Sequence, residues 1–171
     1  MGSDEMGSRR TGKVFRAVVF ALTAFMIGFA FVHSSMSAAA SSVESAEALD
    51  FITQIFRSFG FSIEMTDHII RKLAHFSEFT VIGGLLTSCA YSFDRFKPYR
   101  YIFAVLFTGL FTAVIDEFIQ LFSDGRSGEI VDVLLDFSGV VTGTLIMLLF
   151  YKIYINIRTK SKRDKKENGT D

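Results

Sequence analysis

Four blocks of mostly apolar residues, each about as long as a bilayer-crossing helix, constrain this chain more than any other feature. They occupy residues 14–33, 73–93, 101–122 and 131–155. A helix needs roughly 20 such residues to cross about 30 Å of hydrocarbon. About 50% of the 171 residues are hydrophobic and 20 are Phe, a composition rarely found in a soluble domain. The sequence therefore predicts an all-α membrane protein with four transmembrane helices.

The basic residues are distributed unequally between the two ends of this arrangement. Fourteen of the 18 Lys and Arg residues lie in the N-terminal flank, in the loop 94–100 or in the segment from residue 152 onward. Lys and Arg in short loops mark the cytoplasmic face of a membrane protein. We therefore expect both termini in the cytoplasm and the segments 34–72 and 123–130 on the outer side of the membrane.

One membrane domain over residues 14–155 accounts for most of the chain. The polar residues 1–13 are predicted to be a disordered cytoplasmic end, and residues 156–171 a basic cytoplasmic tail that is disordered from Arg158 onward. In the first outer segment, apolar residues recur every three or four positions over 43–59 with charges between them. This pattern predicts an amphipathic helix, too short and too charged to span, with Ser42 as its N-cap and Gly60 as its stop.

Local signals also refine the helices that span. Thr66 or Asp67 is expected to cap the helix that contains the second block, because both side chains can accept a backbone hydrogen bond. The first block contains no carboxylate and is interpreted as a plain anchoring helix. Small residues in the second and fourth blocks permit close approach of two membrane helices; they are Gly83, Gly84, Gly139 and Gly143.

Charged and polar side chains interrupt three of the four blocks. Carboxylates inside membrane-length segments are costly and usually mark functional sites. Glu78, Asp116 and Asp136 each fall roughly 8–9 Å inside the outer end of their own span at 1.5 Å per residue, which predicts a polar pocket open to the outer surface. The candidate ligand-binding residues are Arg71, Lys72, His75, Glu78, Asp116, Glu117, Gln120, Arg126, Asp132 and Asp136.

These polar stretches resemble the signatures of VanZ-like membrane proteins. The first is RKLAHFSEF at 71–79, and the second is DEFIQ at 116–120, followed by GR at 125–126 and DVLLDFSG at 132–139. Phe79 stands where the family often has Tyr, and the frequent Pro before Gly125 is missing. The resemblance implies a small multi-pass protein of the bacterial cytoplasmic membrane, in a family whose founding member is associated with low-level teicoplanin resistance. It implies no particular reaction.

Two functions are compatible with this group of charged and polar residues. In the preferred one, the pocket binds an envelope-lipid headgroup or a lipid-linked cell-wall precursor, with Lys72 and Arg126 contacting phosphate. In the alternative, the chain is an intramembrane acid–base enzyme acting on a lipid-linked phosphate or acyl substrate. Its candidate catalytic residues are His75, Glu78, Asp116, Glu117 and Asp136.

Other interpretations of the cluster remain open or weaker. The charges could serve only to pair with one another and hold the helices together, although desolvation limits what such pairs contribute. A divalent cation held by His75 and carboxylates is the weakest reading, because no stretch has dedicated metal-ligand spacing, so no metal ligands are assigned. Nucleic-acid binding has no support, since the basic tail lacks interleaved aromatic residues. The oligomeric state is left open.

Overall fold

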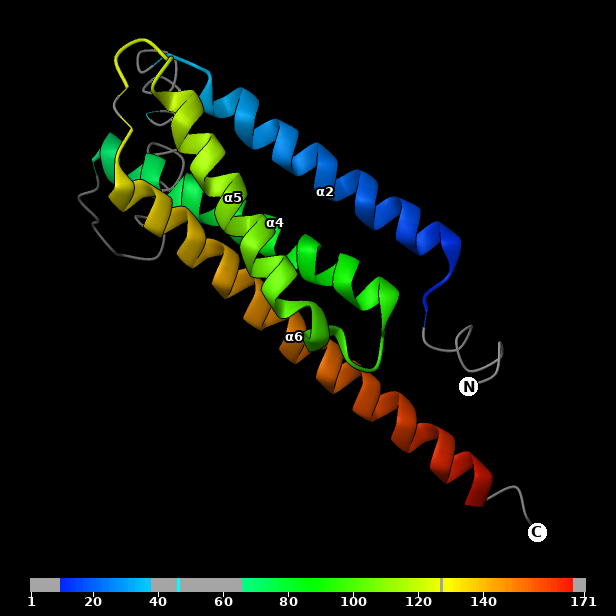
Figure 1. Ribbon diagram of the computed structural model, residues 1–171. Helices are drawn as coiled ribbons and strands as arrows, with labels where there is room; N and C mark the ends of the chain where they lie inside the picture. The colour runs from blue at the N-terminus through cyan, green and yellow to red at the C-terminus, as the bar shows by residue number, and fades with distance from the viewer. Residues whose placement is uncertain (1–9, 38–45, 47–65, 127, 168–171) are drawn as a thin grey trace.

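The computed structural model describes residues 10–37, 46, 66–126 and 128–167, and within them the chain is entirely helical (Figure 1). The four long helices are α2 (Lys13–Ser34), α4 (Asp67–Phe93), α5 (Ile102–Gln120) and α6 (Ile130–Glu167), and the short 3₁₀ helix η1 (Pro98–Tyr101) precedes α5. The amphipathic helix predicted over 43–59, with its cap Ser42 and stop Gly60, lies outside the described residues except for Ala46. The expectation of an all-helical fold is confirmed.

Three of these helices are long and apolar enough to cross a membrane. They are α2, the continuous segment formed by η1 and α5, and the Ile130–Lys160 part of α6. Helix α4 has 27 residues, which is length enough to span, but its polar residues keep it below the apolarity of the other three. The fold is therefore that of a helical membrane protein with three clear candidate spans.

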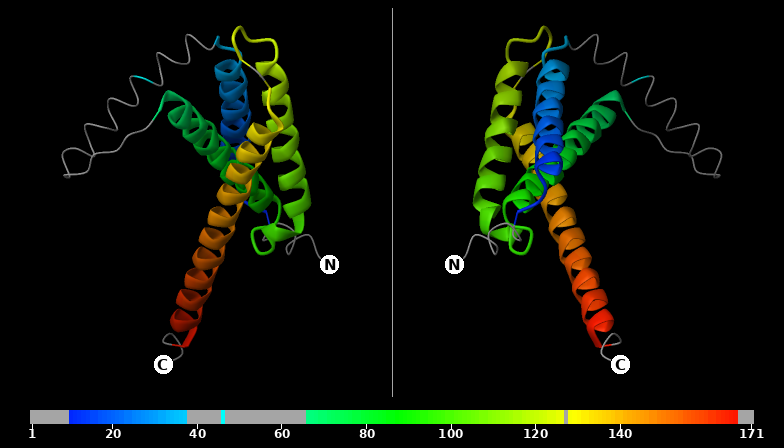
Figure 2. Two further views of the ribbon diagram at one scale, coloured as in Figure 1. Left: turned by 90° about the vertical axis from the view of Figure 1, so that its left-hand side faces the viewer. Right: turned by 90° about the vertical axis from the view of Figure 1, so that its right-hand side faces the viewer.

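Helix α4 lies at the centre of the arrangement and contacts each of the other three long helices. Figure 2 shows α4 and α6 crossing each other, with α2 and α5 beside them. The start of α2, the turn between α4 and η1, and the end of α6 lie toward one end of the bundle (Figure 1). The end of α2 and the turn between α5 and α6 lie at the opposite end, called here the pocket end.

Capping and turn chemistry explain where the helices begin and end. Thr66 caps α4, because its hydroxyl accepts a hydrogen bond from the backbone N–H of Ile69 at 3.4 Å, as the sequence predicts. Asp94 ends α4 by accepting from the backbone N–H groups of Phe96 and Lys97, each at 3.1 Å. In the turn after α5, Gly125 has a φ of 74°, a conformation that favours glycine.

Glycines bring α4 and α6 into backbone contact. A Cβ at Gly83 would overlap the backbone carbonyl of Val140, and one at Gly143 would overlap that of Thr80. Gly139 likewise lies directly against the carbonyl of Phe76. The predicted role of these small residues in close helix packing is confirmed.

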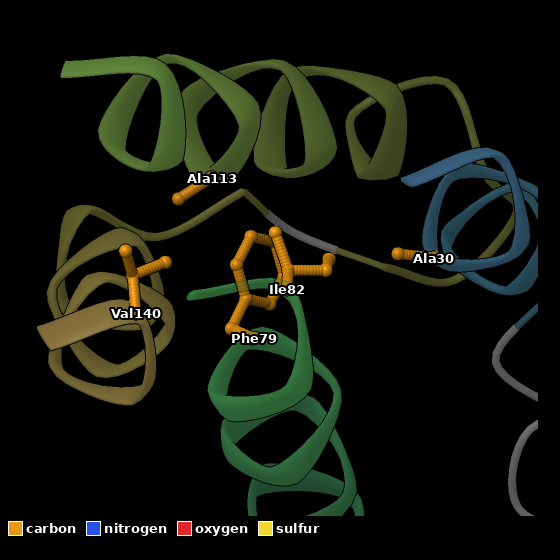
Figure 3. Close-up of a cluster of buried hydrophobic side chains, with 5 residues drawn as sticks. All are labelled: Ala30, Phe79, Ile82, Ala113 and Val140. Atoms are coloured by element: carbon orange, nitrogen blue, oxygen red, sulfur yellow. The ribbon is translucent and has the colours of Figure 1, made fainter. Parts of the chain in front are cut away.

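A compact apolar cluster at this crossing joins all four long helices (Figure 3). Ala30, Phe79, Ile82, Ala113 and Val140 are each no more than 1% exposed. The outward faces are apolar too, with Phe103, Phe107 and Phe122 all more than 70% exposed. Such large exposed apolar area is typical of helices that face lipid.

One expectation about the C-terminal segment is wrong. The sequence predicts disorder from Arg158 onward, yet α6 continues as one helix to Glu167. The segment 144–167 contains neither Gly nor Pro, and Lys, Arg and Glu are good helix formers. Helix α6 therefore projects beyond the end of the other helices (Figure 2).

We predict that Gly143→Ala lowers the stability of the fold by about 1–3 kcal/mol, the usual cost of overpacking a tight contact. The added methyl group would collide with the backbone of Thr80. The matched control is Gly28→Ala in α2, where a Cβ meets nothing within 4 Å and stability should not fall. Thermal unfolding of the two purified variants in detergent compares them, and equal melting temperatures would contradict the role of the crossing.

Candidate functional site

A cavity of about 110 Å³ opens at the pocket end between α4, α6 and the turn that joins α5 to α6. Most of the residues singled out from the sequence contribute to its wall. Its lining residues are His68, Arg71, Lys72, His75, Gln120, Gly125, Arg126, Glu129, Asp132, Leu135 and Asp136. Local helix periodicity explains the grouping, since Arg71 and His75, and likewise Asp132 and Asp136, are four residues apart on one helix face.

Three basic side chains line this cavity. Lys72 forms an ion pair with Asp132 on the facing helix, with 2.5 Å between Nζ and Oδ1. Arg71 comes from the first turns of α4, and Arg126 from the turn before α6. Part of the charge is thus paired within the protein, as the purely structural reading expects, and the lining carries three carboxylates (Glu129, Asp132 and Asp136) beside the three basic side chains.

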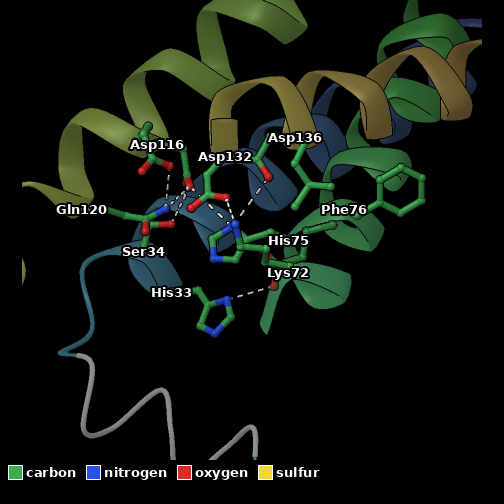
Figure 4. Close-up of polar contacts among 12 residues, drawn as sticks. His33, Ser34, Lys72, His75, Phe76, Asp116, Gln120, Asp132 and Asp136 are labelled. Atoms are coloured by element: carbon green, nitrogen blue, oxygen red, sulfur yellow. Dashed lines mark hydrogen bonds and ion pairs between the residues drawn. The ribbon is translucent and has the colours of Figure 1, made fainter. Parts of the chain in front are cut away.

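The deepest part of the site is a buried group of one imidazole and two carboxylates (Figure 4). The Nδ1 atom of His75 lies 3.7 Å from Oδ2 of Asp116 and 3.9 Å from Oδ1 of Asp136. Asp116 and Asp136 are 0% and 1% exposed. Side chains from α4, α5 and α6 therefore meet at one point, which the sequence predicts for Asp116 and Asp136.

The two carboxylates have different surroundings. Oδ2 of Asp116 accepts hydrogen bonds from the hydroxyl of Ser34 at 2.6 Å and from Nε2 of Gln120 at 3.3 Å. Its Oδ1, and both oxygens of Asp136, are buried without a hydrogen-bond partner among the described residues. Burying such groups without a partner costs free energy, so these three oxygens are the unusual feature of the site.

Glu78 lies beside this group but does not line the cavity. Its Oε1 is 2.9 Å from Nδ1 of His33, and the His33 ring stacks on His75 with 5.7 Å between centroids. The interpretation of the first helix as a plain anchor is therefore wrong, because His33 and Ser34 at its end both contact site residues. The only sequence signal was a histidine and a serine ending an otherwise apolar block.

Glu117 does not face the cavity, although the sequence suggests it as a ligand-binding residue. Its Oε1 accepts a hydrogen bond from the backbone N–H of Glu129 at 2.7 Å, and its Oε2 accepts one from Gln120 at 3.2 Å. It does not line the cavity. Its carboxylate fastens the start of α6 to the end of α5 and so holds the cavity wall in position.

A comparison with family models identifies the chain. The model described as VanZ/LLP1 matches residues 18–151, which is most of the chain. The chain belongs to the VanZ/LLP1 family. Among curated proteins and solved structures, none gives a significant match.

The stretches that resemble VanZ-like signatures lie inside the matched range and form walls of the site. Residues 71–79 form the part of α4 that carries His75, and residues 116–139 carry both buried aspartates. The VanZ/LLP1 assignment thus agrees with the resemblance seen in the sequence. His33 and Ser34 also fall within the matched range, although no signature segment includes them.

We predict that Ser34→Ala destabilises the VanZ/LLP1 fold by roughly 1.5–3 kcal/mol, the usual value of a hydrogen bond to a charged group. The variant removes the 2.6 Å bond to Asp116. The neighbouring Ser35→Ala is the control, because the exposed Ser35 hydroxyl donates to the carbonyl of Val32 in the same turn rather than to a residue of the site. A melting temperature for Ser34→Ala equal to that of the control would contradict this prediction.

Proposed function

We propose that this VanZ/LLP1 protein is a four-span protein of the bacterial cytoplasmic membrane. In this proposal, its outward-facing pocket binds the phosphate-bearing headgroup of an envelope lipid or of a lipid-linked cell-wall precursor. One observation carries the proposal: Arg71, Lys72 and Arg126 line a single cavity at the end of the bundle opposite the basic chain ends. The resemblance to VanZ-like proteins adds a link to glycopeptide (teicoplanin) resistance.

The fourth span in this proposal is α4. At 1.5 Å per residue its 27 residues extend about 40 Å, enough to cross the hydrocarbon core. Its polar residues are largely sheltered by the other helices, since Thr87, Ser88 and Ser92 are each no more than 5% exposed. Their hydroxyls donate to carbonyls of α4 itself, which satisfies them without water. Three apolar helices thus surround a more polar central one.

The distribution of basic residues supports the orientation. Lys13, Arg16, Lys97 and Arg100 lie around the end of the bundle from which α6 projects. Basic residues favour the cytoplasmic side, so the pocket end faces outward in this proposal. Helix α6 would then carry its basic C-terminal turns into the cytoplasm, close to anionic lipid of the inner leaflet.

Cysteine labelling tests this orientation. The native Cys89 is buried, so an introduced cysteine should be the reactive one. A membrane-impermeant maleimide added to spheroplasts should label Asp124→Cys at the pocket end. It should label Tyr99→Cys at the other end only after permeabilisation. The opposite pattern would overturn the orientation, and with it the outward-facing pocket.

The size and chemistry of the cavity favour a small anionic group. A volume of about 110 Å³ is well below the 300–1,000 Å³ typical of sites for drug-sized ligands. Arg offers planar bidentate donors to phosphate, and Lys a compact charge. A headgroup phosphate would occupy the cavity while the acyl or prenyl chain lay along the exposed apolar faces of the helices.

We predict that Arg126→Ala weakens binding of a phosphate-bearing lipid at least tenfold, about 1.4 kcal/mol. Isothermal titration of the purified chain, in detergent with EDTA, would use three probes: dihexanoylphosphatidic acid, dihexanoylphosphatidylcholine and inorganic phosphate. The phosphatidic acid should bind better than the choline lipid, because the choline group neutralises the phosphate. Tight binding of inorganic phosphate alone would instead indicate a free anion as the ligand.

The control for this measurement is Arg100→Ala at the opposite end of the bundle, where Arg100 lies near Asp94. Its affinity should equal that of the unaltered chain. Expression of the same variants in teicoplanin-exposed cells provides the second comparison. Loss of tolerance with Arg126→Ala at normal membrane abundance supports the site, and unchanged lipid affinity in Arg126→Ala would refute it.

The acid–base enzyme remains a second candidate because His75 lies between two buried carboxylates at the cavity floor. An imidazole in contact with acidic groups suits proton transfer. The two functions differ in the fate of the ligand. A lipid-linked phosphate recovered chemically unchanged after incubation with the chain supports a binding protein, and its conversion supports an enzyme.

A further inference from the structure

We propose that His75, Asp116 and Asp136 form a binding site for one divalent cation, of the class of Mn²⁺ or Zn²⁺, at the floor of the cavity. The site requires no lipid and goes beyond the proposed function. Each of the three side chains is buried, and each comes from a different helix. The cation would therefore join α4, α5 and α6 at one point.

The distances within the group fit an ion better than they fit direct contacts. One donor atom from each residue lies within 4.8 Å of the other two. The separations of 3.7 and 3.9 Å from Nδ1 of His75 to the carboxylates exceed hydrogen-bond length. Ligands about 2.0–2.2 Å from an ion lie roughly 2.8–3.6 Å apart at tetrahedral or octahedral angles. Small side-chain rotations would bring all three donors within that range.

The unpartnered oxygens are the second, independent observation. Asp136 is 1% exposed and lines the cavity, and neither of its oxygens has a hydrogen-bond partner among the described residues. Oδ1 of Asp116 is also buried without a hydrogen-bond partner among the described residues. Buried charges are normally paired or coordinate metals. A cation between the two carboxylates would satisfy these oxygens together.

Further acidic side chains near His75, Asp116 and Asp136 would also favour a bound cation. Glu78 reaches the same region through His33, and Glu117 lies on α5 next to Asp116. The ammonium group of Lys72 is held by Asp132 at 2.5 Å. Acidic groups therefore gather around Asp116 and Asp136, and the imidazole of His75 lies within 4 Å of both carboxylates.

The donor set indicates the class of ion. One imidazole nitrogen with two carboxylate oxygens suits Mn²⁺ or Zn²⁺, whereas Mg²⁺ and Ca²⁺ prefer oxygen alone. Three protein ligands leave at least one coordination position, and the cavity lies beside Asp136 and His75. Ser34 and Gln120 would orient the Asp116 carboxylate from outside the first shell of ligands, as ligating carboxylates commonly require.

The test uses the full chain in detergent, stripped with EDTA and then equilibrated with Mn²⁺ or Zn²⁺. Mass spectrometry of the metal content should find about one ion per chain after removal of the excess. Electron paramagnetic resonance of the Mn²⁺ form should show bound rather than aqueous ion. Asp136→Asn and His75→Gln should each weaken metal binding at least tenfold, and added metal should no longer raise their melting temperatures.

The matched control is Asp124→Asn, which removes an exposed carboxylate in the turn between α5 and α6, outside the cavity lining. It should bind metal as the unaltered chain does. An unaltered chain that retains neither ion near one per chain would overturn the proposal, even if the variants failed to fold. Equal affinity in a well-folded Asp136→Asn would overturn it too.

The metal and lipid proposals can fail separately. Lipid binding is measured with EDTA present and depends on Arg126, whereas metal binding is measured without lipid and depends on Asp136. Metal binding with no phosphatidic acid binding would refute the lipid pocket and support the cation site. Phosphatidic acid binding by a chain that retains no metal would support the lipid pocket and refute the cation site.

Discussion

The backbone contact between α4 and α6 is the constraint on which the rest of the structure depends. Gly139 lies against the carbonyl of Phe76, and the same turns carry Asp136 and His75. Because glycine has no side chain, the two helices approach closely enough for those polar groups to meet. Without this crossing the cavity would lose the wall that α4 and α6 share.

The site places its charges in two layers. Residues of both charges line the cavity, with His75 and Asp136 among them, and Asp116 lies behind the lining beside His75. Burial of the two aspartates is expensive in a low-dielectric environment, and hydrogen bonds from Ser34 and Gln120 compensate only Asp116. The chain thus maintains a costly group of buried carboxylates next to a cavity lining that carries charges of both signs. Both proposals follow from that arrangement, one from each layer.

The apolar surface and the polar interior are two consequences of the same environment. The most exposed side chains include Phe103 and Phe122, while Asp116 and Asp136 are among the most buried. In water this distribution would be unfavourable, because folding normally removes apolar area from solvent. In lipid it is expected, since backbone and side-chain polar groups must be satisfied inside the protein. The VanZ/LLP1 fold therefore concentrates its chemistry where its helices meet.

The sequence by itself determined the helical class, a cap at Thr66 or Asp67, the glycine-mediated packing and the convergence of Asp116 with Asp136. These follow from composition and from helix periodicity, which are local properties. Only the tertiary structure decided that His33 and Ser34 join the site, that Glu117 fastens a turn, and that Glu78 bonds His33. The partner of a side chain depends on the rotation and crossing of whole helices, which no local spacing specifies. The extension of α6 to Glu167 could have been predicted from the sequence, because Lys, Arg and Glu favour helix. The many charges in that segment led instead to a prediction of disorder.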